Sequence, residues 1–117
     1  MLPSMDTRQV LAPQQTQKLL REVRTSLEAL YGDELSDVRL FGSYARRQAN
    51  PDSDVDVLVV LREVGDYGAQ VRRVRTLLSR VSLEYGKTVA PVFVDTLRLA
   101  SGADPFIAQV AREAISA

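Results

Sequence analysis

The sequence predicts an α/β domain of the α+β type, in which helices pack on a small mixed β-sheet. Residues 55–61 are all Val or Leu except for Asp56, which is typical of a strand buried on both faces. Residues 14–31 and 71–85 each carry apolar side chains at helical spacing. Segments of the two kinds alternate in the order α-β-α-β-α-β-α, and 117 residues suffice for one domain with a single core.

The N-terminal part predicts an arm followed by a helix. Residues 1–13 have no clear period and contain a proline near each end, so we expect a loosely held arm in front of a domain that covers residues 14–117. The first helix covers residues 14–31, and Gly32 ends it. Its apolar face is formed by Leu20, Val23, Leu27 and Leu30.

Two strands and a short helix follow. Residues 38–41 predict a short strand that ends at Gly42, and residues 43–48 can form a brief helix before the Asn-Pro-Asp sequence at 50–52 interrupts it. Residues 55–61 then form a strand in the middle of the sheet, because both of its faces are apolar.

The C-terminal half predicts a long helix, a strand and a last helix. Residues 71–85 present an apolar stripe that ends at a Gly-Lys pair, and residues 88–94 follow as a strand. Residues 101–103 predict a loop, after which Asp104 and Pro105 supply the cap and the first turn of a helix. One face of this helix carries Ile107, Val110, Ala111 and Ala114.

Charge and composition exclude several classes of function. Basic and acidic residues number 15 each, so no overall field draws the protein to nucleic acid or to an anionic membrane. The chain has no cysteine and no histidine, which leaves a hard, oxygen-liganded ion such as Mg²⁺ as the metal to expect. No apolar run approaches the roughly 20 residues of a membrane span. We therefore expect a cytoplasmic protein that binds neither nucleic acid nor membrane directly.

One motif carries chemistry: Gly42 and Ser43, followed after ten intervening residues by Asp54 and then by Asp56. On a strand, the two aspartates leave the same face and can share one cation. The Gly-Ser pair lies where a strand gives way to a helix, and the backbone N–H groups there favour an anion such as phosphate. Together the two halves predict a site for a nucleoside triphosphate with Mg²⁺.

Each half of the motif also has a purely structural interpretation. A Gly-Ser pair at a strand end is commonly a turn, and an Asp-x-Asp pair is commonly a solvated strand entrance. Neither explains an acid at position 56 of a Val-Leu strand, so we favour the functional interpretation.

Arg46 and Arg47 either neutralise phosphate charge or line a solvated helix face, and we favour the first for Arg46. Tyr44 is close enough in sequence to contact a nucleotide.

This segment resembles the signature of the DNA polymerase β-like nucleotidyltransferase superfamily, and specifically its minimal nucleotidyltransferase (MNT) branch. The branch pattern is G-S-x-A-R-G-x-A-x-x-x-S-D-x-D, and Arg47 stands where the pattern has its second glycine. The order of elements extends the resemblance over most of residues 14–116, and it implies the nucleotidyltransferase fold. The matching residues are Gly42, Ser43, Ala45, Arg46, Ala49, Ser53, Asp54 and Asp56.

The resemblance implies transfer of AMP from ATP to a hydroxyl acceptor. Asp54 and Asp56 would then be catalytic residues and Mg²⁺ ligands, and Gly42, Ser43 and Arg46 would bind the nucleotide. Members of the superfamily usually carry a third carboxylate on a later strand.

Asp95 is the only acid near the end of the strand at 88–94, so it is the candidate for that third catalytic and metal-binding position. The alternative is that Asp95 only ends the strand, which would leave transferase activity weak or absent.

The resemblance also implies a partner. Small MNT proteins resemble the antitoxin half of HEPN/MNT toxin–antitoxin pairs, in which the MNT protein adenylylates a tyrosine of the HEPN ribonuclease. Two alternatives stay open. One is a nucleotide-binding antitoxin that acts by contact alone. The other is a transferase for a small molecule, which would need a second domain or a homo-oligomer such as a dimer to build the acceptor pocket.

Overall fold

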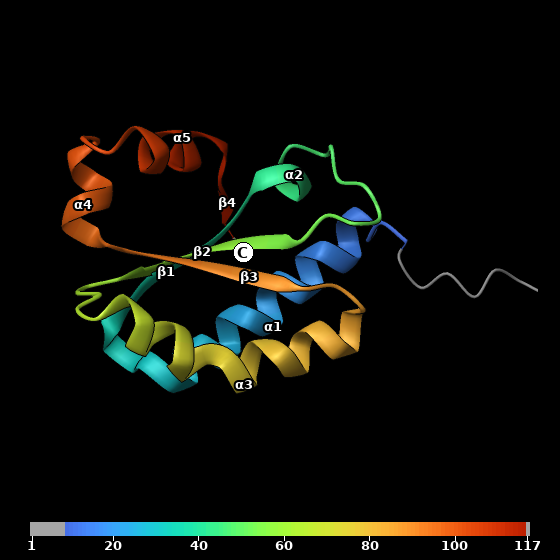
Figure 1. Cartoon of the computed structure of the whole chain (residues 1–117), viewed down its shortest axis with the longest axis horizontal. Helices are drawn as coiled ribbons and strands as arrows, with labels where there is room; N and C mark the ends of the chain where they lie inside the picture. Colours follow the sequence, from blue (N-terminus) through green and yellow to red (C-terminus); the bar gives the residue numbers. More distant parts are fainter. Residues whose placement is uncertain (1–8, 117) are drawn as a thin grey trace, which may run out of the picture.

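The computed structural model describes residues 9–116 and contains a four-stranded mixed sheet (Figure 1). Strand β1 (Leu35–Phe41) pairs antiparallel with β2 (Val55–Leu61), and β3 (Val89–Asp95) pairs parallel with the other edge of β2. The short β4 (Ile115–Ser116) pairs antiparallel with β1, which gives the order β3-β2-β1-β4. The sheet is therefore mixed, as the sequence predicts.

Helices cover both faces of this sheet (Figure 1). On one face lie α1 (Pro13–Tyr31) and α3 (Tyr67–Tyr85), which pack against each other and against the strands. On the other face lie α2 (Gly42–Ala45), α4 (Thr96–Ser101) and α5 (Pro105–Glu113). None of the helices among residues 9–116 combines the length and the apolarity that crossing a membrane requires.

The central position predicted for residues 55–61 is confirmed. Every side chain from Val57 to Leu61 is at most 1% exposed. Side chains alternate along the strand, so Val57 packs toward α1 and α3 whereas Leu58 packs toward α5. The same alternation places Asp56 on the face of the sheet that carries α2 and α5.

The long helix α3 begins earlier than the sequence analysis predicts. Asp66 caps it, because its carboxylate accepts a hydrogen bond from the backbone N–H of Ala69 (3.1 Å). Gly68 weakens the helical signal of this first turn, and the predicted start at Val71 misses it. The helix ends at Gly86, whose φ of 66° is the left-handed conformation that favours glycine.

The C-terminal region adds two elements to the predicted order. Helix α4 directly follows β3, so Ser101, predicted to lie in a loop, is helical. Helix α5 ends at Glu113, and the chain then pairs with β1 through Leu40 and Ile115. Strand β4 gives no local sequence signal, because it is only two residues long and its pairing partner lies far away in the sequence.

Most of the arm predicted at residues 1–13 lies outside the described residues. Of its last residues, Leu11 donates its backbone N–H to the hydroxyl oxygen of Tyr44 (3.3 Å), and Pro13 already belongs to α1. Proline suits this first helical position because no helical carbonyl is available there for an N–H to bond. The hydrogen bond from Leu11 connects the segment before α1 to α2.

Arg47 is the single non-glycine residue with a positive φ among the described residues, at 57°. It follows α2 at the position where the MNT pattern has glycine. A side chain in this left-handed conformation costs roughly 1–2 kcal/mol through the contact of Cβ with the following carbonyl. The turn therefore keeps the glycine conformation although the glycine is absent.

We expect Arg47→Gly to stabilise the protein by about 0.5 to 1 kcal/mol. The substitution relieves the backbone strain, and this gain exceeds the additional entropy that a glycine loses on folding. Urea denaturation measures the difference. Arg47→Ala is the matched control, because it removes the guanidinium but retains Cβ and should not raise stability. Equal stabilisation by both substitutions would contradict the assignment of strain to Arg47.

Candidate active site

A hollow of about 400 Å³ lies between α2 and α5, on the face of the sheet to which Asp56 points. It brings together four of the residues that the sequence analysis singles out, and α5 supplies the opposite wall. The lining residues are Phe41, Gly42, Ser43, Arg46, Asp56, Phe106, Gln109, Val110 and Glu113.

Gly42 and Asp56 are in direct contact at the base of this hollow. The β1–β2 register pairs Phe41 with Asp56, which places Gly42 beside the aspartate as the chain leaves β1. Gly42 has a φ of 75°, and a Cβ built on it would overlap Oδ2 of Asp56 and lie 3.1 Å from its Cγ. Only glycine satisfies both the conformation and the close approach.

Asp54 and Asp56 form an electrostatically coupled pair. Asp54 is exposed just before β2, and Asp56 is half-buried at the second position of the strand. Burial raises the pKa of Asp56, the neighbouring charge of Asp54 raises it further, and Arg46 partly lowers it. A bound cation would offset the burial and the repulsion together, so the pair fits a divalent ion.

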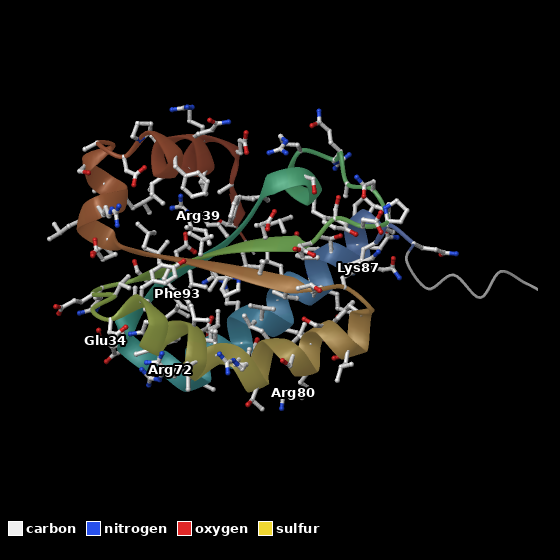
Figure 2. The ribbon with its side chains drawn as sticks, in the orientation of Figure 1. Glu34, Arg39, Arg72, Arg80, Lys87 and Phe93 are labelled. Carbon is white, nitrogen blue, oxygen red and sulfur yellow. The ribbon has the colours of Figure 1, made fainter. Side chains whose placement is uncertain are left out.

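Lys87 holds the loop that leads to Asp54, a role that the sequence analysis does not identify. Its side chain is 6% exposed, and its ammonium donates to the carbonyl oxygen of Pro51 (2.9 Å). Beside it, the N–H of Val55 donates to the carbonyl of Thr88 (2.8 Å). Lys87 lies at the end of the sheet where β2 begins (Figure 2). The turn between α3 and β3 thus fixes the start of β2, where Asp54 and Asp56 lie.

Arg46 reaches across the hollow to α5. Its Nη1 lies 3.0 Å from Oε2 of Glu113, and its Nε donates to Gln48 (3.3 Å). The Arg46 side chain is 43% exposed, so an incoming anion has access to it. No local pattern singles out Glu113, because only the fold joins it to Arg46, 67 residues earlier.

The structure does not bring Asp95 together with Asp54 and Asp56. In the parallel β2–β3 register, Asp95 pairs with Leu61 whereas Ala90 pairs with Asp56. Five residues of strand separate Ala90 from Asp95, a distance of roughly 17 Å. Asp95 instead caps α4 by accepting the backbone N–H of Arg98 (3.0 Å). Within residues 9–116, no three His, Cys, Asp or Glu residues gather as a group that could hold a metal ion.

Ala90 occupies the place from which β3 could supply a third carboxylate. It is the in-register neighbour of Asp56, so its side chain leaves the same face of the sheet. It is half-buried and carries no oxygen ligand.

Tyr44 lies away from the hollow, which corrects the expectation that it contacts a nucleotide. Its side chain is 8% exposed and belongs to the core between the sheet and α1. Ser43 and Arg46 are three positions apart in the α2 turn and face the hollow together, whereas Tyr44 points to the opposite side.

Comparison with known proteins agrees with this geometry. The family model described as the nucleotidyltransferase domain matches residues 20–104. Two proteins of Methanocaldococcus jannaschii, provisionally named protein adenylyltransferases, are each 32% identical to the chain. The first match extends over 75 residues, 64% of this chain and 75% of the relative. The second extends over 78 residues, 66% of this chain and 53% of the relative.

Two solved structures share the fold. One, described as a provisional minimal nucleotidyltransferase, is 29% identical with a TM-score of 0.61, and the alignment covers 92% of this chain and 97% of the other. A second, described as a toxin–antitoxin with AMP-PNP, is 24% identical with a TM-score of 0.53 and coverages of 91% and 72%. The resemblance identified in the sequence is thereby confirmed.

We expect Gly42→Ala to lower the free energy of unfolding by about 3 kcal/mol, because it combines left-handed strain with a collision against Asp56. Gly65→Ala is the matched control. Gly65 has a φ of 62°, but nothing lies within 4 Å of a Cβ placed on it, so that substitution should cost only about 1 kcal/mol. Urea denaturation of both variants measures the difference, and equal losses would contradict the contact.

Ala90→Asp should strengthen binding of Mn²⁺, used as a probe for Mg²⁺, by at least roughly tenfold, because it adds an oxygen ligand beside Asp56. Isothermal titration calorimetry measures the affinity. Ala100→Asp adds the same charge at an exposed position of α4 and serves as the control. If the two variants bind Mn²⁺ equally, position 90 does not adjoin the metal.

Proposed function

The chain belongs to the nucleotidyltransferase domain family, and from this premise we propose that it moves AMP from ATP to a hydroxyl group of a partner protein, with pyrophosphate as the leaving group. The observation that carries the proposal is the contact between Gly42 and Asp56. It joins a backbone turn suited to phosphate to an aspartate in the same hollow, and Asp54, two positions earlier, completes a pair of carboxylates suited to a cation.

Asp54 and Asp56 would hold Mg²⁺, which supplies neutralisation of the triphosphate charge when bound. Gly42 and Ser43 bind the outer phosphates through the backbone of the turn and the serine hydroxyl. Asp95 has no part in this site, because it caps α4 at the far end of the sheet.

Arg46 exchanges one anion for another in this proposal. Arg46 is paired with Glu113 at 3.0 Å, and the pair is accessible to solvent. A triphosphate carries more charge than a single carboxylate and offers bidentate contacts to a guanidinium, so it displaces Glu113. Arg46 then helps to position the phosphates for in-line attack by the acceptor hydroxyl.

We propose a HEPN-type ribonuclease as the partner and one of its tyrosines as the acceptor. The protein adenylyltransferase names of the relatives and the toxin–antitoxin description of a solved structure support this choice. The assignment places the protein in the cytoplasm, where ATP and such a ribonuclease meet. The hollow is open to solvent, which suits an acceptor that a second protein presents.

A second candidate is an antitoxin that binds nucleotide and silences its partner by contact alone. The observation that favours it is Ala90, which leaves Asp56 without a third carboxylate on the neighbouring strand. With the same nucleotide present, a cation held by two aspartates has one anionic protein ligand fewer than a cation that a third carboxylate also holds, so it is bound more weakly. The two candidates differ in whether the aspartates are needed to silence the partner.

Incubation of the purified protein with ATP, Mg²⁺ and the protein encoded beside it in the genome should add an adenylyl group to a tyrosine of that protein, as detected by mass spectrometry. The double variant Asp54→Ala/Asp56→Ala should lose this modification and should no longer suppress ribonuclease activity. Asp33→Ala, an exposed aspartate in the turn after α1, is the control and should retain both. Suppression by the double variant would favour contact over transfer.

A further inference from the structure

One wall of the hollow carries an exposed aromatic side chain that the fold does not require. Phe106 is 56% exposed at the second position of α5. The helix is anchored to the sheet by Ile107 and Val110, which are 5% and 3% exposed. Its start is fixed by Asp104, which accepts the backbone N–H groups of Phe106 (2.9 Å) and Ile107 (3.3 Å). The Phe106 ring therefore contributes little to the packing of α5 on the sheet or to the cap of the helix.

The position of Phe106 distinguishes it from the other exposed large apolar residues of the described chain. Only Phe106 among them lines the hollow that contains Asp56. The other exposed aromatic, Tyr67, packs edge-on against Phe93 at 5.6 Å, and its hydroxyl oxygen accepts the backbone N–H of the same residue (3.2 Å). The remaining exposed apolar residues are Val10, Leu83, Leu97 and Ile115.

Phe106, Gln109 and Glu113 form one face of α5, at helical spacings of three and four residues. Glu113 contacts Arg46 and so marks the phosphate end of the hollow. Phe106 lies seven residues away along the helix, roughly 10 Å from that end. This separation suits the sugar and base that follow the phosphates of a nucleotide.

We propose that Phe106 and Gln109 form the nucleobase subsite of the hollow. The inference rests on the proposed function and deepens it by naming the residues that receive the base of the nucleotide. The Phe106 ring stacks on the face of the base, which is a contact that any nucleobase can make. The Gln109 amide offers one donor and one acceptor, which matches the N6 amino group and ring nitrogen of adenine.

The interaction of Gln109 with Glu113 is compatible with this role. Nε2 of Gln109 lies 3.4 Å from Oε1 of Glu113, a long hydrogen bond on an exposed helix face. The amide oxygen has no hydrogen-bond partner among residues 9–116. The Watson–Crick edge of guanine also places one acceptor, O6, beside one donor, N1–H, so the amide can pair with either purine.

Calorimetric titration of the full chain with Mg²⁺-ATP and with Mg²⁺-tripolyphosphate tests the subsite. Phe106→Ala should weaken the affinity for ATP by about tenfold and leave the affinity for tripolyphosphate unchanged, because tripolyphosphate has no base to stack. Phe106→Tyr should retain ATP binding. Leu97→Ala, which removes an exposed apolar side chain of α4, is the matched control and should change neither affinity. Gln109→Ala should weaken the affinity for ATP and leave the affinity for tripolyphosphate unchanged.

The failures of the two proposals are distinguishable. If tripolyphosphate binds in the presence of Mg²⁺ but Phe106→Ala leaves ATP affinity unchanged, the base subsite is overturned and the proposed function stands. If Phe106→Ala lowers the affinities for ATP and for tripolyphosphate equally, the ring only shapes the hollow, and the subsite is again overturned. If the wild-type chain binds neither ligand, both proposals fall.

Discussion

The contact between Gly42 and Asp56 is the constraint on which the site depends. It arises from the pairing of β1 with β2, which sets Phe41 opposite Asp56 and brings the next residue against the carboxylate. Because Gly42 adopts a positive φ, the chain turns at once into α2 and directs Ser43 into the hollow. The backbone proposed to bind phosphate and the carboxylate proposed to bind the metal are thus placed by one backbone register.

The charges around this contact are incompletely balanced within the chain itself. Asp56 and Glu113 line the hollow together with Arg46, and Asp54 adds its negative charge near Asp56. Burial and this repulsion raise the pKa of Asp56. An anionic nucleotide alone would add repulsion to this arrangement, whereas a nucleotide accompanied by a divalent ion would remove it. The fold accommodates the half-buried Asp56 because the other residues of β2 are buried apolar side chains. In addition, Lys87 fixes the loop that leads into β2.

Local patterns predict much of this molecule. The apolar run of β2, the stripes of α1 and α3 and the motif from Gly42 to Asp56 are each contained in a short segment, and the family comparisons confirm the resemblance that they carry. What sequence reasoning misses depends on distant partners. Glu113 meets Arg46 only because α5 folds over α2, and β4 exists only because β1 pairs with it.

Asp95 shows the limit most clearly. In the sequence it is the only acid near the end of the strand predicted at residues 88–94. Because β3 runs parallel to β2, however, the last residue of β3 lies at the opposite end of the sheet from Asp56. Strand direction and register cannot be read from a single apolar run. The register instead identifies Ala90 as the neighbour of Asp56.

Anomalous diffraction from crystals grown with Mn²⁺ and a non-hydrolysable ATP analogue tests the central claim most directly. The account predicts a metal peak bonded to carboxylate oxygens of both Asp54 and Asp56, with the phosphates of the analogue against Gly42 and Ser43. A metal bound elsewhere, or an analogue seated in the hollow with no metal at the two aspartates, would contradict it.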